Sequence, residues 1–357
     1  MIEIVKELSE IAEKWTEPEY RARPELSYST ISTYESLGFS GLDHLFDKKE
    51  SPSLLLGSLV DTAITGGEDE FNRLYTILDI NITDSGIDIC KALVNQGFPF
   101  DTFEEIPENI VSSVAKSVGF WQGDKWDNTR YKQVLKTGNI ADYYNALKHS
   151  DKIIVDTNTY QTALAMVRAL RESPATSGYF ADNDELSPIR RYYQLKFKAT
   201  IENVGYRCMM DCVVVDYENK IIYPIDLKTS STPEWEFEKS FVKWHYLIQA
   251  IIYHKLLRTN LDKDPYFKDF KLDDYRFIVV NAKTLTPLVW KFPLTQERGP
   301  FIDSDGKEWP DPFELGKELQ GYLNLRPQVP NGINLYGDNI IKCLTKKLNP
   351  EILTINI

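Results

Sequence analysis

Two acidic residues and a lysine are spaced along the chain so that they could share one catalytic patch. Asp211 precedes a run of three valines, and Asp226-Leu227-Lys228 follows the apolar run IIYPI. A short polar break (ENK) separates the two runs, so residues 205–228 predict a β-hairpin. Side chains alternate along a strand, which puts Asp226 and Lys228 on one face and Leu227 on the other. The hairpin would bring Asp211 beside that pair.

Such a patch predicts metal-dependent chemistry. Converging carboxylates repel one another unless a proton or a cation lies between them. Hard oxygen ligands suit Mg²⁺ or Mn²⁺, and the Leu227 carbonyl is expected as a third protein oxygen beside Asp211 and Asp226. Lys228 could orient a water or steady an oxyanion, which together predicts metal-assisted phosphodiester hydrolysis. The alternative is structural: Asp211 caps a bend, and Lys228 is a solvated strand end.

Residues 209–230, MMDCVVVDYENKIIYPIDLKTS, resemble the core motif of the PD-(D/E)xK nuclease superfamily. They are most similar to its branch of RecB- and RecE-type nucleases and phage recombination exonucleases. There the motif is followed by a helix that carries a Gln and a Tyr one turn apart. The segment 235–257 is predicted as that helix, with Gln249 and Tyr253 on one face. The resemblance, which covers residues 194–258, implies that both steady the substrate or Lys228.

Two further positions depart from the pattern of that superfamily. Residues 54–65 predict a buried helix in which Asp61 stands where relatives carry a metal-site His, one turn after Gly57. The resemblance implies that Asp61 completes the metal shell; the alternative is a helix charge or a buried hydrogen-bonding residue. Gln194, on a predicted strand at 189–201, lies near the place of a Glu that assists the metal. An amide can hydrogen-bond but supplies no charge, so Gln194 is expected to support the site.

Composition and charge predict the location of the protein and how it could bind nucleic acid. The chain has 357 residues, 42% of them hydrophobic, and a net charge of −12. It contains no apolar run long enough to span a bilayer, and its first residues lack the apolar core of a signal peptide, so we expect no membrane association and a cytoplasmic location. The acidic charge argues against wide coating of nucleic acid but allows a local basic groove. The basic residues nearest the patch are Arg190, Arg191, Lys196, Lys198, Arg207, Lys239 and Lys243.

Cysteine spacing and helical patterns supply the remaining expectations. No Cys/His cluster has zinc spacing, and the chain lacks the cysteine set of the iron–sulfur relatives, so no cluster is predicted. Cys208 and Cys212 would share one strand face. Apolar spacing predicts an amphipathic helix over residues 1–22 and a helical insertion at 84–150. Aromatic residues of the insertion are candidates for base stacking or, alternatively, for an ordinary core: Trp121, Trp126, Tyr131, Tyr143 and Tyr144.

The sequence therefore predicts one α/β domain over residues 1–357, with a restriction-endonuclease-like core and a central mixed β-sheet flanked by helices. The expected activity is that of a Mg²⁺-dependent DNA exonuclease in recombination or repair, of the phage type. Its expected partners are DNA and, by resemblance, a single-strand annealing or recombination protein. Two other hypotheses stay open: a nuclease fold that binds DNA or protein without cutting, and an assembly protein whose acidic and basic residues form a salt-bridge network.

Overall fold

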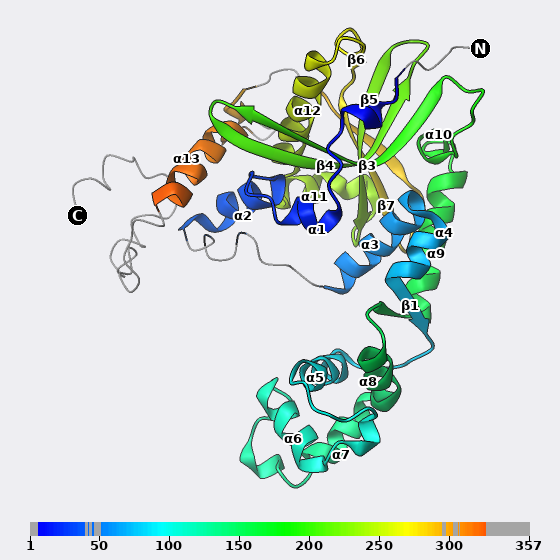
Figure 1. The fold of residues 1–357 in the computed structure, drawn as a ribbon, viewed down its shortest axis with the longest axis vertical. Coiled ribbons are helices and arrows are strands. Elements are labelled where there is room, and N and C mark those ends of the chain that lie inside the picture. The colour runs from blue at the N-terminus through cyan, green and yellow to red at the C-terminus, as the bar shows by residue number, and fades with distance from the viewer. Residues whose placement is uncertain are drawn as a thin grey trace, which may run out of the picture. The chain divides into compact units, whose positions relative to one another are not determined.

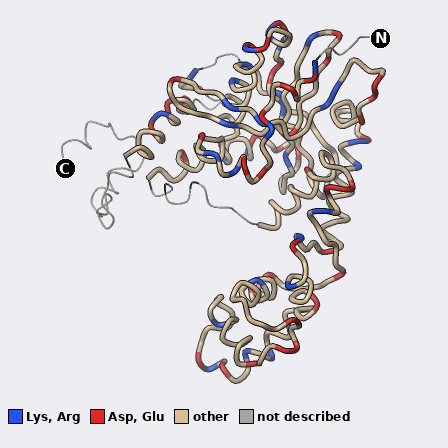
Figure 2. The backbone as a smooth tube through the Cα atoms, viewed as in Figure 1, with Lys and Arg blue, Asp and Glu red and all other residues tan. Residues whose placement is uncertain are grey.

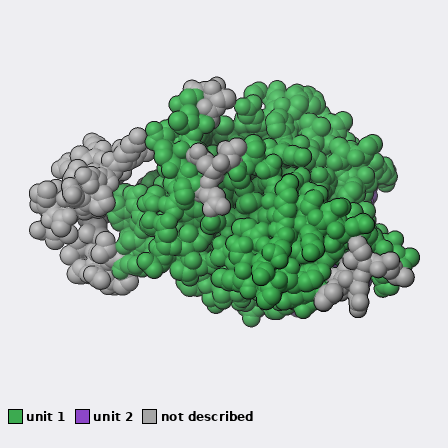
Figure 3. Space-filling view, turned by 90° about the horizontal axis from the view of Figure 1, so that it is seen from above, with its two compact units in different colours: residues 1–53, 168–357 green, residues 54–167 purple. Residues whose placement is uncertain are grey.

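A computed structural model of the chain describes residues 6–39, 42, 45, 51–294, 298–302, 306 and 308–325. The chain divides into two compact units, the first of which is drawn in green in Figure 3. Unit 1 comprises residues 1–53 and 168–357, and unit 2 comprises residues 54–167. Each unit buries an apolar cluster of its own.

Unit 1 is built on a mixed six-stranded sheet with the order β3-β4-β5-β7-β8, and β6 pairs with β5 (Figure 1). The pairs β3–β4, β4–β5 and β7–β8 are antiparallel, whereas β5 and β7 are parallel. A parallel pair needs a crossover connection, and here helices supply it. The fold is therefore the central mixed sheet with flanking helices that the sequence predicts. The strands are β3 (Ile189–Ile201), β4 (Val204–Asp216), β5 (Ile221–Ser230), β6 (Lys271–Leu272), β7 (Tyr275–Asn281) and β8 (Leu288–Phe292).

Helices of unit 1 come from both ends of the chain, from the crossover and from the segment before β3. The longest, α12, packs on β3, β4, α2 and α13. A small separate sheet pairs β9 (Phe301–Ile302) with β10 (Glu308–Trp309). The helices are η1 (Leu8–Ile11), α1 (Glu17–Arg21), α2 (Tyr28–Leu37), α10 (Ser177–Phe180), η6 (Glu234–Glu236), α11 (Phe237–Lys243), α12 (Tyr246–Lys263) and α13 (Pro312–Leu325).

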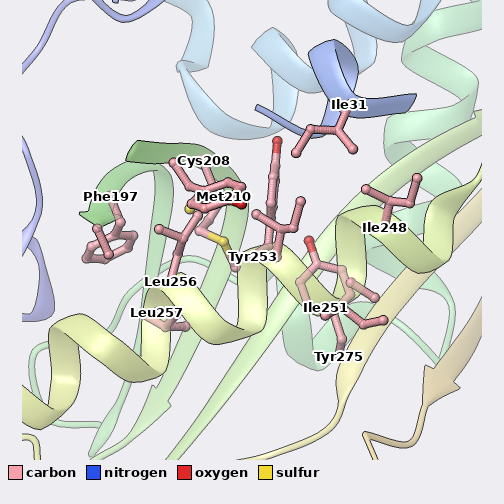
Figure 4. Packing of buried hydrophobic residues seen from close by; sticks show 14 of the residues in the cluster. Ile31, Phe197, Cys208, Met210, Ile248, Ile251, Tyr253, Leu256, Leu257 and Tyr275 are labelled. Carbon is pink, nitrogen blue, oxygen red and sulfur yellow. The ribbon is translucent and has the colours of Figure 1, made fainter. Parts of the chain in front are cut away.

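The main core lies between α12 and the sheet. Figure 4 shows Ile248, Ile251, Leu256 and Leu257 of α12 grouped with apolar side chains of the strands, such as Phe197. Truncating a fully buried member such as Leu256 to alanine would cost about 2–5 kcal/mol. The helix that carries Gln249 is thus fixed firmly against the sheet that carries Asp211 and Asp226.

The alternation of β4 reverses at Asp211. Cys208 and Met210 belong to the main core, and so does Val213, although strict alternation would turn Val213 away. The β3–β4 ladder skips the pair of Gln194 and Asp211, where Gln194 adopts φ 52°. Cys212 consequently faces the other side, with its sulfur 3.9 Å from the Tyr179 carbonyl oxygen. The expectation that Cys208 and Cys212 share a face is therefore wrong.

Unit 2 is mainly helical and packs around its own apolar cluster, which includes Tyr143 and Tyr144. Both rings are buried, so the core interpretation applies to them, whereas Trp121 stays 36% exposed. Helices α3 and α9 each cross a boundary between the units. The elements are α3 (Pro52–Thr65), α4 (Gly67–Leu74), β1 (Tyr75–Leu78), α5 (Asp84–Asn95), η3 (Phe103–Glu105), α6 (Glu108–Ser117), η4 (Asp124–Trp126), α7 (Arg130–Val134), η5 (Leu135–Thr137), α8 (Ile140–His149), β2 (Ile153–Asp156) and α9 (Thr157–Glu172).

Two predicted helices are interrupted. The described part of the first 22 residues forms the short η1 and α1, because Thr16 caps a new helix that carries proline in its first turn. The predicted helix 235–257 divides into η6, α11 and α12, with His245 in the left-handed region at φ 56°. The predictions for the hairpin, for the strand at 189–201 and for a helix over 54–65 are confirmed.

Candidate active site

The hairpin register confirms that Asp211 lies beside Asp226. Its last printed pair is Cys212 with Ile225, so the next positions along the two strands are those of the aspartates. There the strands separate, and Oδ2 of Asp211 accepts a hydrogen bond from the Leu227 backbone N–H at 2.9 Å. At the end of the β4–β5 pairing, a side-chain carboxylate thus replaces a backbone carbonyl as the hydrogen-bond acceptor.

Asp226 and Lys228 form an ion pair on one face of β5. Lys228 Nζ lies 2.7 Å from Asp226 Oδ2, and the side chains of Asp226 and Lys228 are 2% and 19% exposed. Isolated buried charges are costly, so both are expected to have further partners. Gln249 supplies them: its amide nitrogen donates to Asp226 Oδ1, and its amide oxygen accepts from Lys228 Nζ at 3.1 Å. The three side chains close a polar triangle between β5 and α12.

The ammonium of Lys228 also lies over an aromatic ring. Its Nζ is 4.4 Å from the ring centroid of Tyr246, the first residue of α12. That ring stacks on Phe237 and Phe277 at centroid separations of 5.7 and 5.6 Å, and Tyr28 packs beside it at 6.1 Å. A cation over a ring face is attracted by the ring's quadrupole. The Tyr246 ring therefore helps to hold the lysine head in place.

Charge balance keeps Lys228 protonated. Burial by itself would lower the pKa of Lys228, but the adjacent Asp226 carboxylate together with other nearby groups, which include Asp211, outweighs burial, and the pKa stands above its ordinary value. Burial raises the pKa of Tyr28 and of Tyr246, so both phenols are neutral at neutral pH. Lys228 can consequently donate hydrogen bonds and attract anionic groups, but it cannot serve as a base at neutral pH.

Tyr253 lies one turn beyond Gln249 but is part of the core. It is 7% exposed, and its ring meets Tyr275 edge-on at 6.4 Å. Burial raises the pKa of Tyr253 well above its usual value, and the charges of Asp226 and Asp211 add to the effect. The structure thus brings together Asp211, Asp226, Lys228 and Gln249, whereas Tyr253 belongs to the main core.

Gln194 and Asp61, the two positions that depart from the superfamily pattern, lie outside the triangle. Gln194 is on β3 beside Asp211, at the point that the ladder skips, and its backbone carbonyl accepts from Lys196 Nζ at 3.4 Å. Asp61 lies on α3 within unit 2 and is partly buried. The role of each in the site stays a prediction.

Three of the seven basic residues expected near the patch are engaged elsewhere. Arg190 and Arg191 donate to backbone carbonyls of the segment 178–189, including Asp184 and Gly178. Arg207 is 4% exposed and donates to the carbonyls of Arg23 and Glu25. Acidic and basic residues are interspersed along the chain (Figure 2). These three arginines therefore do not form a basic groove at the site.

Comparison with known protein families finds a match over residues 31–270 to the family described as a PDDEXK-like domain of unknown function. The matched range contains the whole triangle together with Asp211. The chain belongs to this family. A crystal structure described as "Putative exonuclease", from Eubacterium rectale, is 14% identical and covers 97% of this chain and 100% of its own, with a TM-score of 0.43. Comparison with the curated proteins returned no match.

Membership in the PDDEXK-like family supports a nuclease, and members of the wider superfamily generally use divalent metals. In the part of the chain that the structure describes, no group of three or more His, Cys, Asp or Glu residues could hold a metal ion. Mg²⁺, however, usually takes only one or two protein carboxylates and leaves its other positions to water and substrate phosphate. Asp226 Oδ2 is buried and makes no directional hydrogen bond with any described residue, although Lys228 is near. The donor set of Asp211 and Asp226 therefore fits such a metal.

Sequence reasoning missed Tyr246 and Tyr28 in this PDDEXK-like site. Tyr246 precedes Gln249 by three positions, a spacing that places both on one helix face, so a signal for it was present. Tyr28 follows Ser27 at the start of α2 and gave no such signal, because its neighbour Tyr246 is remote in sequence. None of the helices in the described ranges combines the length and apolar character needed to cross a bilayer.

Proposed function

We propose that this protein is a Mg²⁺-dependent deoxyribonuclease, an exonuclease that acts in recombination or repair. The observation that carries the proposal is the polar triangle of Asp226, Lys228 and Gln249 beside Asp211. A buried ion pair is seldom worth more to stability than apolar residues of the same size. Its presence in a PDDEXK-like domain, at the end of a strand pairing, supports a chemical role.

The metal would be Mg²⁺, with Mn²⁺ able to substitute, held by Asp211, Asp226 and the Leu227 carbonyl. When bound, it supplies positive charge for the scissile phosphate and lowers the pKa of a coordinated water. The N–H and C=O of one strand residue point to the same side, and the Leu227 N–H points to Asp211, which supports the carbonyl as a ligand. Asp61 of unit 2 would add a further carboxylate, as the resemblance implies.

The remaining residues would position the reacting groups. Lys228 would orient the attacking water and steady negative charge on the phosphate, because its ammonium stays protonated. Gln249 would hold Lys228 and Asp226 at a fixed separation. Tyr253 would support the same helix face from the core, and Gln194 would assist next to Asp211 by hydrogen bonding alone. We further propose that residues 84–150 are a helical insertion in one nuclease domain over residues 1–357 and that a recombination protein is a partner.

Cleavage of linear duplex DNA in Mg²⁺ tests the proposal. Asp226→Ala and Lys228→Ala should lose activity, while Asp269→Ala and Lys263→Ala, which alter exposed residues, should retain it. Cleavage by the first two variants at the wild-type rate would reject the assignment. Circular substrates and substrates with protected 5′ or 3′ ends then separate exonuclease from endonuclease action and give the polarity.

A nuclease fold that binds nucleic acid without cutting it is the second candidate. It is favoured by Gln194, an amide on β3 beside Asp211 where relatives carry an acid. Calorimetric titration with Mg²⁺ and Mn²⁺ discriminates between the two. A protein that binds DNA but neither metal would support the second candidate.

A further inference from the structure

The two most exposed tryptophans of the seven in the chain flank one short helix of unit 1. Trp235 in η6 is 58% exposed, and Trp244, at the end of α11, is 53% exposed. Val242 between them is 38% exposed. Large exposed apolar groups commonly mark a binding surface, and these three lie within the segment 235–244. These three residues, called the α11 surface below, are absent from the main core.

The α11 surface is linked to the candidate site by the chain itself and by the contacts of Tyr28. The segment 231–245 connects β5, which carries Lys228, to α12, which carries Gln249. The Tyr28 hydroxyl donates to the Trp244 carbonyl at 2.5 Å, and Tyr28 packs against the ring that lies under Lys228. Trp244 is therefore attached to the residues that hold the lysine.

Trp235 is held in place by a buried acid. Its neighbour Glu234 is fully buried and accepts hydrogen bonds from the backbone N–H groups of Asn281 at 2.9 Å and Thr286 at 3.1 Å. Trp290 donates its indole N–H to the Glu234 carbonyl at 3.0 Å. These bonds fix the backbone on one side of Trp235. A ring presented from a fixed backbone loses less entropy on binding a partner than one on a mobile loop.

The charges around the α11 surface favour stacking over phosphate contacts. Lys243 Nζ lies 4.7 Å from the Trp244 ring centroid, and Lys239 is paired with Glu236 at 2.8 Å. Unpaired bases present free π-faces that stack on aromatic side chains, whereas bases inside a duplex are stacked on one another. A surface that offers one cationic group and exposed aromatic rings is thus suited to a single strand.

We propose that Trp235 and Trp244 form a stacking platform for unpaired bases of single-stranded DNA next to the catalytic patch. The inference rests on the proposed function, since it assumes that the adjacent site acts on DNA. It names the substrate class: a strand whose bases are unpaired where it passes the α11 surface. Because Lys239 is already neutralised, stacking rather than counterion release should provide most of the affinity at this surface.

Fluorescence anisotropy with a labelled single-stranded oligonucleotide, in EDTA to prevent cleavage, measures the effect. Trp235→Leu and Trp244→Leu should each weaken binding roughly tenfold, Trp→Phe at either position should weaken it less, and Leu186→Ala, at an exposed position outside the α11 surface, should bind as the wild type does. The dependence of log Kd on log salt should keep its slope in the Leu variants. Wild-type affinity in both Leu variants would overturn the proposal, as would a loss of equal size for duplex DNA; a surface that serves a protein partner gives the first result.

A phosphodiester strand without bases separates this inference from the proposed function. With Mg²⁺, a strand of abasic tetrahydrofuran nucleotides should be cleaved equally by the wild type and by Trp244→Leu, since it offers no base to stack on the indole ring. If the wild type cleaves neither this strand nor DNA, the nuclease assignment fails, and the anisotropy result still decides on the tryptophans. Circular dichroism melts confirm that each variant is folded.

Discussion

The carboxylate of Asp211 accepts a hydrogen bond from the Leu227 backbone N–H at 2.9 Å, where the β4–β5 ladder ends. One side chain thereby does two things: it completes the hydrogen bonding of β5, and it brings a negative charge next to Asp226. The hydrogen bond needs only an acceptor oxygen, whereas the second function needs the charge. An amide in place of the acid could still accept the bond but would carry no charge.

Asp211→Asn should therefore fold and fail to cut. The variant keeps an oxygen for Leu227 N–H, so its melting temperature should remain close to the wild-type value. The lost charge should reduce kcat by at least about 100-fold, as expected when a metal ligand is removed. Melting curves and Mg²⁺-dependent cleavage of DNA check the two parts. Full activity in this variant would remove Asp211 from the metal site.

Gln249→Leu should lower kcat about 10- to 100-fold, the usual cost of losing a residue that orients the groups at a metal site. The leucine leaves Asp226 Oδ1 and Lys228 Nζ without the amide that joins them. Leaving buried polar groups unsatisfied should also lower the unfolding free energy by about 1–3 kcal/mol. Urea unfolding and steady-state kinetics measure both effects. The matched control is Gln161→Leu, at an exposed helical position, and equal behaviour of the two variants would contradict the prediction.

Much of this geometry could be predicted because it is local. Alternation places Asp226 and Lys228 on one strand face, and the i, i+4 spacing places Gln249 and Tyr253 on one helix face. The turn between β4 and β5 is short, so the pairing of the two strands follows from the two apolar runs. Only neighbours in sequence are needed for each of these steps.

Other features depend on contacts between distant segments. His245 takes a left-handed conformation that residues other than glycine adopt rarely, and nothing in the sequence KWHY marks a helix break. The break is accompanied by the hydrogen bond from Tyr28 to the Trp244 carbonyl and by packing of the His245 ring on Trp309 at 5.4 Å. Likewise, the reversal of β4 at Asp211 involves Gln194 on the neighbouring strand. Single-sequence patterns hold no information on such pairings.

Tyr246→Leu should reduce kcat about 30-fold, since a desolvated cation–π contact is worth about 2 kcal/mol. Tyr246→Phe keeps the ring under Lys228 and should retain near-wild-type kcat; this recovery distinguishes a π contact from a role of the hydroxyl. KM for DNA should change little in either variant, because the ring positions Lys228 rather than the strand. Equal loss in the Phe and Leu variants would exclude the π contact as the cause.

Asp264 gives a pH dependence of stability at a distance from the catalytic residues. It follows α12, is 8% exposed, and accepts from the backbone N–H groups of Tyr266 at 3.0 Å and Phe267 at 3.2 Å and from Lys6 Nζ at 2.5 Å. Burial would raise the pKa of Asp264, but the hydrogen bonds from Lys6 and from the two N–H groups outweigh it and lower the pKa below its ordinary value.

A lowered folded-state pKa means that the stabilisation is complete above the unfolded pKa, about 3.9, and disappears as pH falls through the folded value. Asp264→Asn, which has no charge to lose, should be less stable than the wild type by about 1–2 kcal/mol at pH 7. The difference should shrink below about pH 4, where the wild-type carboxylate also becomes neutral. Urea unfolding of both proteins between pH 3 and pH 8 measures this. A difference that stays constant down to pH 3 would show that Asp264 stabilises the end of α12 through its neutral hydrogen bonds and not through its charge.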